Sequence, residues 1–214
     1  MAHVFICESS NHTPQLLRPS NNIRFCRGLS PRSYAPSGFI AWIDASMLVA
    51  YNDCCAAFGM PIYATGFHNL SSGSHPAGSA HYAGLAFDMG QGLDDNELHI
   101  LRKLCFEFFD YVQPNYLTPR WVHAELFAKD LCGYFSYPFL EIGSFGTHVY
   151  LLQDALCLSG FPIALTGRFG TDTHDALCRF CYENALSVTS GLVDCSVWQA
   201  LMGKVISVNH KIIT

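Results

Sequence analysis

The residues best suited to chemistry lie in the segment Ser79–Asp88, which carries His81 and Asp88 seven positions apart. Imidazole and carboxylate groups are common zinc ligands, and Gly84 permits a tight backbone path between the two side chains. If the segment ends in a strand, Ala86 and Asp88 share one face, and the small Ala86 leaves space beside the carboxylate. A catalytic zinc ion usually has three protein ligands and one open position, so this segment predicts only part of a metal site.

A third candidate ligand, His123, lies in the segment Arg120–Leu126. In a strand, His123 and Glu125 would share one face, while Val122 and Ala124 would face the other way. The pattern therefore predicts a polar pair on a strand that is otherwise suited to a hydrophobic core.

Together these motifs, Ser-x-His-x-x-Gly-x-Ala-x-Asp and then Trp-x-His-x-Glu, resemble the D-Ala-D-Ala carboxypeptidase family of zinc peptidases. That family also contains phage L-alanyl-D-glutamate endolysins, and it resembles the zinc fold of hedgehog signalling domains. The resemblance covers roughly residues 40–130. It implies that His81, Asp88 and His123 bind zinc, and that a mixed α+β fold carries the site on a small antiparallel sheet.

The chain departs from the family at the residues expected to bind substrate. Family members commonly have Ser-Gly-Tyr-Arg before the histidine motif, and its arginine binds the substrate carboxylate. Here the segment is Thr65-Gly66-Phe67-His68, so His68 stands at the arginine position. Histidine is a weaker and pH-dependent anion partner, which disfavours carboxypeptidase action. We expect His68 and Ser79 to contact substrate, and Arg120 is an alternative carboxylate partner.

The general base is the second departure. Several relatives have an acidic residue three positions before the last zinc histidine, where this chain has Arg120. Glu125 is the best substitute, and Glu125 and Arg120 are the candidate catalytic residues. Zinc would lower the pKa of its bound water and polarise the scissile carbonyl, while a nearby base takes a proton from the water. Without a base, the metal site would serve binding alone.

Hydrophobic periodicity and capping residues predict the elements that position these side chains. Residues 11–38 are rich in Pro, Ser, Asn and Arg and are predicted to be irregular. Asp94 or Asp95 can cap the second helix. The predicted elements are a helix over 40–58, a strand over 62–67, a loop over 69–79 in which His75 lies beside the site, a strand over 83–89, a helix ending near 109 and a strand over 121–126.

The C-terminal segment predicts three short helices, in which Thr171 caps the second and Asp194 the third. Its order of motifs over residues 146–203 resembles the peptidoglycan-binding domain type 1. We expect its core to contain Leu152, Leu156, Leu177, Phe180, Trp198 and Leu201.

The fold class is thus predicted to be α+β, with a small antiparallel-sheet zinc peptidase domain followed by a three-helix peptidoglycan-binding bundle. The predicted boundaries are 1–136 for the peptidase domain, 137–145 for a linker, 146–204 for the bundle and 205–214 for a tail. A chain of 214 residues has room for one ordinary domain and a small one.

Composition excludes several classes of protein. The formal net charge is −5 and no long Lys/Arg run exists, which argues against nucleic-acid binding. No apolar stretch approaches the roughly 20 residues that span a bilayer. The first residues lack the basic segment of a secretory signal, so we expect synthesis in the cytoplasm and action on the wall after release. Most of the ten cysteines are expected to be reduced and buried, and the protein is expected to be a monomer.

The two resemblances imply a zinc-dependent, endolysin-like peptidase that hydrolyses an amide bond in the stem peptide of bacterial peptidoglycan and is targeted to the wall by its bundle. Two alternatives remain open. One is a D-Ala-D-Ala carboxypeptidase, and the other is an inactive, zinc-stabilised protein that only binds the wall.

Overall fold

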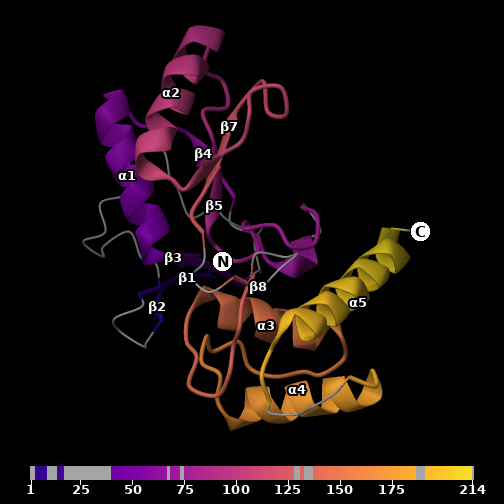
Figure 1. Ribbon diagram of the computed structural model, residues 1–214. Helices are drawn as coiled ribbons and strands as arrows, with labels where there is room; N and C mark the ends of the chain where they lie inside the picture. Colours follow the sequence, from indigo (N-terminus) through magenta and orange to yellow (C-terminus); the bar gives the residue numbers. More distant parts are fainter. Residues whose placement is uncertain are drawn as a thin grey trace.

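The structure is a computed structural model that describes residues 3–8, 14–16, 40–66, 68–72, 75–127, 131–132, 137–186 and 191–213. These residues form a mixed arrangement of five α-helices and small β-sheets, in which the predicted class, α+β, is recognisable (Figure 1). The sheets and the first two helices occupy one end of the molecule, and the last three helices occupy the other.

A three-stranded sheet forms near the N-terminus from β1 (His3–Cys7), β2 (Gln15–Leu16) and β3 (Ile40–Asp44), in the order β2-β1-β3. Strands β1 and β3 are parallel, and Phe5 pairs with Trp42. The prediction of a helix starting at residue 40 is therefore wrong for its first five residues. A short apolar run fits a buried strand as well as a helix, and only the pairing with β1 decides between them.

Helix α1 (Ala45–Phe58) follows β3 directly. Asp44 caps its N-terminus, because the Asp44 carboxylate accepts a hydrogen bond from the Ser46 backbone N–H at 2.9 Å. Gly59 ends the helix in the left-handed conformation with φ +82°, and its N–H is bonded to the Cys55 carbonyl. The predicted stop at Gly59 is thus confirmed.

A four-stranded antiparallel sheet carries the candidate site. It contains β4 (Ala64–Thr65), β5 (Ala86–Met89), β7 (Val122–Glu125) and β6 (Tyr111–Val112), in the order β4-β5-β7-β6. The predicted strand over 121–126 is confirmed. The predicted strand over 62–67 is observed only at Ala64–Thr65, and residue 67 lies outside the described residues. The predicted strand over 83–89 starts at Ala86, because residues 80–84 form turns.

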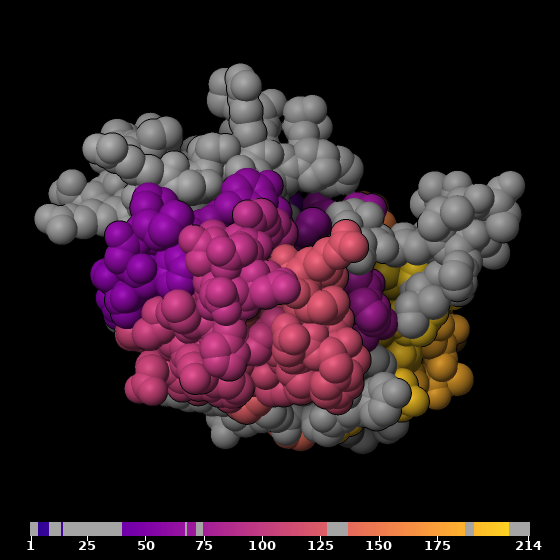
Figure 2. All heavy atoms as spheres, turned by 90° about the horizontal axis from the view of Figure 1, so that it is seen from above, coloured from indigo at the N-terminus to yellow at the C-terminus, as the bar shows by residue number. Residues whose placement is uncertain are grey.

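Helix α2 (Asp95–Phe108) packs beside α1, and the two helices cover one face of this sheet (Figure 1). In the space-filling view their side chains form one continuous surface (Figure 2). Asp94 caps α2 in a capping box with Glu97, as the sequence predicted. Phe87, Val122 and Ala124 point into the core under these helices, so the opposite face of β5 and β7 is left for polar side chains.

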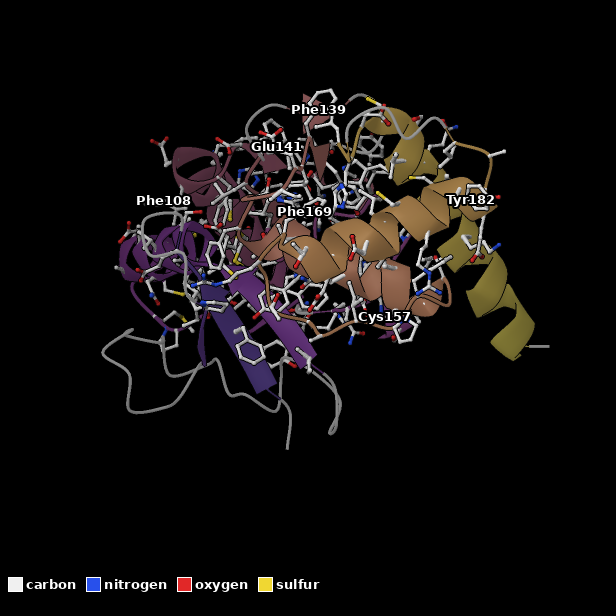
Figure 3. All side chains as sticks on the ribbon, turned by 90° about the horizontal axis from the view of Figure 1, so that it is seen from below. Phe108, Phe139, Glu141, Cys157, Phe169 and Tyr182 are labelled. Carbon is white, nitrogen blue, oxygen red and sulfur yellow. The ribbon has the colours of Figure 1, made fainter. Side chains whose placement is uncertain are left out.

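Three helices form the C-terminal bundle: α3 (Thr147–Leu158), α4 (Thr171–Glu183) and α5 (Cys195–Ile213). The three predicted helices and the six predicted core residues are confirmed. Asp194 caps α5 by accepting hydrogen bonds from the backbone N–H groups of Ser196 and Val197. Gly170 precedes α4 without a side-chain cap, so the predicted capping role of Thr171 is wrong. Buried Phe169 lies at the start of α4 and exposed Tyr182 projects near its end (Figure 3).

The bundle and the N-terminal sheet share one hydrophobic core. The ring of Tyr150 in α3 stacks on Trp42 with centroids 5.4 Å apart and on Phe5 at 5.6 Å. The buried carboxylate of Asp154 accepts a hydrogen bond from the Leu70 N–H, at the start of the short 3-10 helix η2 (Leu70–Ser72), at 2.9 Å. The hairpin of β8 (Leu131–Cys132) and β9 (Tyr137–Pro138) leads from the sheet to the bundle.

Seven cysteines with described side chains are free, and most of them are buried, as the sequence predicted. Cys195 is an exception because it forms a disulfide, whose partner lies outside the described side chains. Cys195 is the exposed first residue of α5. Among the described residues, no helix combines the length and apolarity needed to cross a membrane.

Candidate metal centre

Strand pairing brings the two sequence motifs together. Asp88 in β5 lies directly opposite His123 in β7, and Ala86 lies opposite Glu125. All four side chains belong to the sheet face that points away from α1 and α2, because strand side chains alternate. The small Ala86, between these side chains on the same face, leaves space beside the Asp88 carboxylate, as the sequence predicted.

Three potential ligand atoms converge on this face. The Nδ1 atom of His123 lies 2.9 Å from Oδ1 of Asp88 and 3.2 Å from Nε2 of His81. The third distance, from His81 Nε2 to Asp88 Oδ1, is 3.5 Å. The predicted ligands His81, Asp88 and His123 are therefore adjacent in space, although 42 positions of sequence separate the first from the last.

His81 is held in one orientation by the backbone of Gly66. The imidazole is 1% exposed, and its Nδ1 lies 3.0 Å from the Gly66 carbonyl oxygen. Because a carbonyl only accepts, Nδ1 carries the proton and Nε2 presents a lone pair. Such a partner on the far nitrogen is the usual way in which proteins orient a metal-binding histidine. A side chain on Gly66 would collide with this ring, since a Cβ would lie 2.7 Å from Nδ1.

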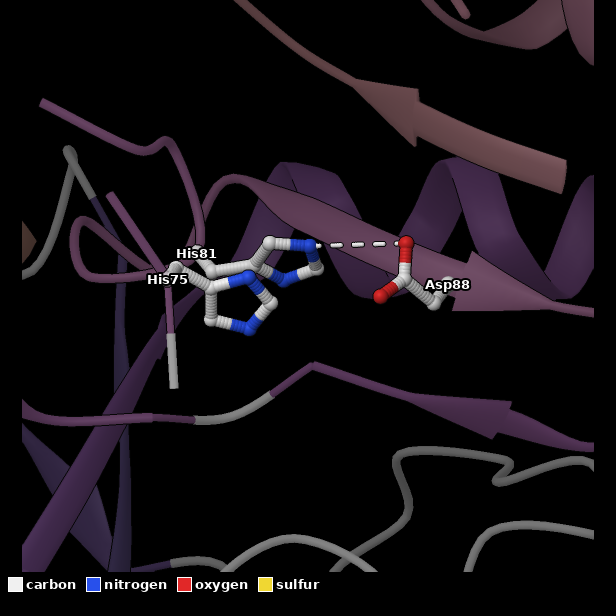
Figure 4. Close-up of side chains that lie close together, drawn as sticks. All are labelled: His75, His81 and Asp88. Atoms are coloured by element: carbon white, nitrogen blue, oxygen red, sulfur yellow. Dashed lines mark ion pairs between the residues drawn. The ribbon is translucent and has the colours of Figure 1, made fainter. Parts of the chain in front are cut away.

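Two further histidines surround His81. The His75 ring stacks on the His81 ring with centroids 4.0 Å apart and an interplanar angle of 18°, and Figure 4 shows the two rings beside Asp88. The His68 ring meets His75 edge-on at 4.7 Å. His75 is fixed by Tyr82, whose hydroxyl donates to the His75 carbonyl and accepts from its N–H.

This cluster contains a group that could hold a metal ion. The potential ligand atoms of His75, His81 and Asp88 all lie within 4.8 Å of one another. His123 is a further candidate ligand, because its Nδ1 contacts both His81 and Asp88.

Within the cluster, the negative charge of Asp88 and the positive charge of His123 stabilise each other. Burial opposes the charge of Asp88, but hydrogen bonds with His123 and His81 outweigh it and hold the pKa of the carboxyl well below its usual range. Burial also opposes a proton on His123, but its contacts with Asp88 and Glu125 outweigh burial and raise the pKa of His123 to about 9. His123 and Asp88 therefore form an ion pair at neutral pH in the metal-free protein.

The cluster forms part of the wall of an open cleft of about 660 Å³. Asp88, Glu125 and the rings of His75, His81 and His123 lie on one side of the lining. Trp121, Tyr111 and Phe127 supply aromatic surface, while Tyr137 comes from β9 and His148 from the start of α3 in the bundle. No Lys or Arg belongs to the described lining.

The remaining predicted site residues occupy different positions. Glu125 lines the cleft, with Oε2 3.8 Å from Nε2 of His123. Ser79 also lines the cleft, and its hydroxyl accepts a hydrogen bond from the His81 backbone N–H. His68 contacts the rings of His75 and His81 but lies outside the described lining. The Arg120 side chain is exposed and is likewise absent from the described lining.

Sequence reasoning missed Arg102, which shapes the far rim of the cleft. The residue is 9% exposed, and its guanidinium donates to the backbone carbonyls of Gln113, Thr118 and Trp121. It thereby fixes the loop from β6 to β7, which supplies cleft-lining residues. An arginine in the amphipathic pattern of α2 resembles a solvated residue, so the sequence contains no signal for this role.

Comparison of the chain with protein-family models, with curated proteins and with solved structures gave no match. Function must therefore be inferred from the chemistry of the site.

Proposed function

We propose that the protein is a zinc-dependent peptidase that hydrolyses an amide bond in the stem peptide of bacterial peptidoglycan. The observation that carries this proposal is the convergence of His81, Asp88 and His123 in the wall of an open cleft. The resemblance of the two sequence motifs to zinc peptidases supports the same conclusion.

The distances between the three ligand atoms fit zinc. Ligand nitrogen and oxygen atoms at 2.0–2.2 Å from a tetrahedral zinc ion lie about 3.4 Å from one another. The separations of 2.9, 3.2 and 3.5 Å among His123, Asp88 and His81 are close to that value. Two imidazoles and one carboxylate leave a fourth position for water or substrate, which is the arrangement of catalytic rather than structural zinc sites.

His123 is a better third ligand than His75. A metal ion binds in the plane of an imidazole ring, along the nitrogen lone pair. The His75 and His81 rings are stacked nearly parallel, so their lone pairs lie in separate planes rather than meeting at one point. His123 is inclined to His81 by 62°, and its Nδ1 faces Nε2 of that ring. We therefore assign His81, Asp88 and His123 as ligands and His75 as a neighbour of the site.

Glu125 is the proposed general base. When bound, zinc would acidify a water molecule and polarise the scissile carbonyl. Glu125 lies on the same strand face as His123 and lines the cleft, so its carboxylate can take the proton from the water and deliver it to the leaving amine. Arg120, the other candidate catalytic residue, is exposed and less well placed for such a role.

The charge of the cleft favours an endopeptidase over a carboxypeptidase. Recognition of a terminal carboxylate usually involves a cationic side chain, most often a bidentate arginine. The described lining contains no Lys or Arg, and its side chains near the proposed zinc site are imidazoles and carboxylates. An internal peptide bond makes no demand for such a cation. The three-helix bundle, through its resemblance to the peptidoglycan-binding domain type 1, is proposed to hold the wall.

Digestion of purified peptidoglycan, with and without a zinc chelator, tests the proposal when the products are identified by mass spectrometry. We expect new amino or carboxyl ends inside the stem peptide that disappear with chelator. Loss of terminal D-alanine alone would show a carboxypeptidase. A zinc-loaded, folded protein that binds several wall types but cleaves none would leave the wall-binding alternative.

A further inference from the structure

An additional imidazole reaches the cleft from the bundle rather than from the sheet. His148 is the second residue of α3, and it lines the cleft together with the proposed zinc ligands. Its Nε2 atom is buried and has no hydrogen-bond partner among the described residues. A buried polar atom without a hydrogen-bond partner is energetically unfavourable. A ligand in the cleft that reaches this atom would supply the missing partner.

The position of His148 is fixed by its surroundings. Its ring packs against Tyr137 with centroids 5.8 Å apart, and the Tyr137 hydroxyl donates to the backbone carbonyl of Ser79. Further along α3, Tyr150 stacks on Trp42. These contacts place His148 at the wall of the cleft, although it belongs to the bundle.

The chemistry of His148 suits an uncharged partner. Burial lowers the pKa of His148 to about 4, so the imidazole is neutral at neutral pH. A neutral imidazole has one N–H donor and one nitrogen acceptor. Both match the N–H and C=O groups of a peptide bond, and neither requires a counter-charge.

We propose that His148 is a substrate-binding residue that hydrogen-bonds a backbone amide group of a peptide lying in the cleft. The inference rests on the proposed peptidase function and adds a role for the bundle. Helix α3 then contributes directly to peptide recognition, in addition to any contact that the bundle makes with the wall.

The test is steady-state hydrolysis of a soluble stem pentapeptide by the zinc-loaded full chain, with His148→Leu and His148→Gln. Leucine keeps the apolar volume and removes the polar atoms. We expect His148→Leu to raise KM about fivefold, as for the loss of one neutral hydrogen bond, with kcat within twofold. Glutamine retains a hydrogen-bonding group and should give an intermediate KM. The soluble peptide lacks glycan, so wall binding does not enter the measurement.

Thermal unfolding separates this role from a structural one. Replacing an unpaired buried polar group with leucine should leave the midpoint temperature unchanged or raise it. His99→Leu on the exposed side of α2 is the matched control and should change neither KM nor stability. An unchanged KM in both His148 variants overturns the inference and leaves the peptidase function intact. If the wild-type protein cleaves no stem peptide, both this inference and the proposed peptidase function are wrong.

Discussion

Two buried polar clusters, one in the bundle and one on the sheet, differ in how their hydrogen bonds are satisfied. In the bundle, the 1%-exposed Gln153 accepts hydrogen bonds from the backbone N–H groups of Thr166 and Gly167. Its amide nitrogen lies 3.0 Å from each of three acceptors, which are the Thr166 hydroxyl, the Arg168 carbonyl and the Thr173 hydroxyl. On the sheet, the nitrogen and oxygen atoms of three side chains face one another across 2.9–3.5 Å.

This difference separates a polar cluster that maintains the fold from one that binds a ligand. Gln153 fixes the loop from α3 to α4, and every group of its side chain has a partner within the protein. In the sheet cluster, Nε2 of His81 and Oδ1 of Asp88 both face Nδ1 of His123, and a bound cation that displaces the His123 proton would take all three atoms as ligands. We therefore expect changes in the bundle cluster to affect stability, and changes in the sheet cluster to affect metal binding.

The largest effect is expected for Asp88→Asn. The variant loses the negative charge among the three ligands, so zinc affinity should fall by more than about 100-fold, beyond the range typical of residues that only support ligands. Calorimetric titration with zinc measures the change. Asp53→Asn on the exposed face of α1 is the control. Unchanged affinity in Asp88→Asn would break the distinction between the two clusters.

Glu125→Gln should separate catalysis from metal binding within the sheet cluster. An amide cannot accept the proton from water, so stem-peptide hydrolysis should fall by about 10²–10⁴-fold while zinc remains bound. Rates on the soluble peptide and zinc content of the same sample provide the two readings. Full activity in this variant would show that Glu125 is not the base.

Gln153→Ala should affect the fold alone. Loss of the amide leaves the Thr166 and Gly167 N–H groups without their acceptor, which should lower the free energy of unfolding by about 4 kcal/mol. Chemical denaturation measures this loss, and Gln199→Ala on the exposed side of α5 is the control. Zinc stoichiometry should not change. A loss of zinc at temperatures where the variant is folded would contradict the conclusion that the bundle cluster affects stability and not metal binding.

A smaller, pH-dependent effect on stability is expected at Asp154, where α3 of the bundle contacts the Leu70 backbone. Burial raises the pKa of Asp154 to about 6, although the hydrogen bond from Leu70 opposes the rise. The folded state then favours the protonated form, so this group's contribution to stability falls as pH rises from about 4 to about 6 and is constant above.

Asp154→Asn removes this titration and keeps an acceptor for the Leu70 N–H. The variant should gain stability relative to wild type between pH 4 and pH 7, by at most about 3 kcal/mol. Urea denaturation at the two pH values checks the gain. A difference between the two proteins that does not vary with pH would show that Asp154 does not titrate as proposed.

The sequence was most informative for local features, such as helix caps and strand alternation, which depend on neighbouring residues alone. The alternation of His123 and Glu125 with Val122 and Ala124 predicted both the strand and its polar face. The capping residues Asp94 and Asp194 predicted two helix starts.

The sequence was least informative where distant segments decide the outcome. Strand β3 was mistaken for the start of a helix because its partner, β1, lies more than thirty positions away. His148 and Arg102 look ordinary in their helices, and only the packing of those helices against other segments brings them to the cleft or its rim. The pairing of Asp88 with His123 was implied by family resemblance rather than by spacing.

The most direct test of the central claim is the zinc content of His123→Ala and His75→Ala after loading and dialysis, measured by elemental analysis and native mass spectrometry. Both histidines lie beside His81, so the two variants are matched in place and in chemistry. The assignment of His81, Asp88 and His123 as ligands predicts one zinc ion per chain in wild type and in His75→Ala, and none in His123→Ala. Zinc that is retained in His123→Ala and lost in His75→Ala would contradict it.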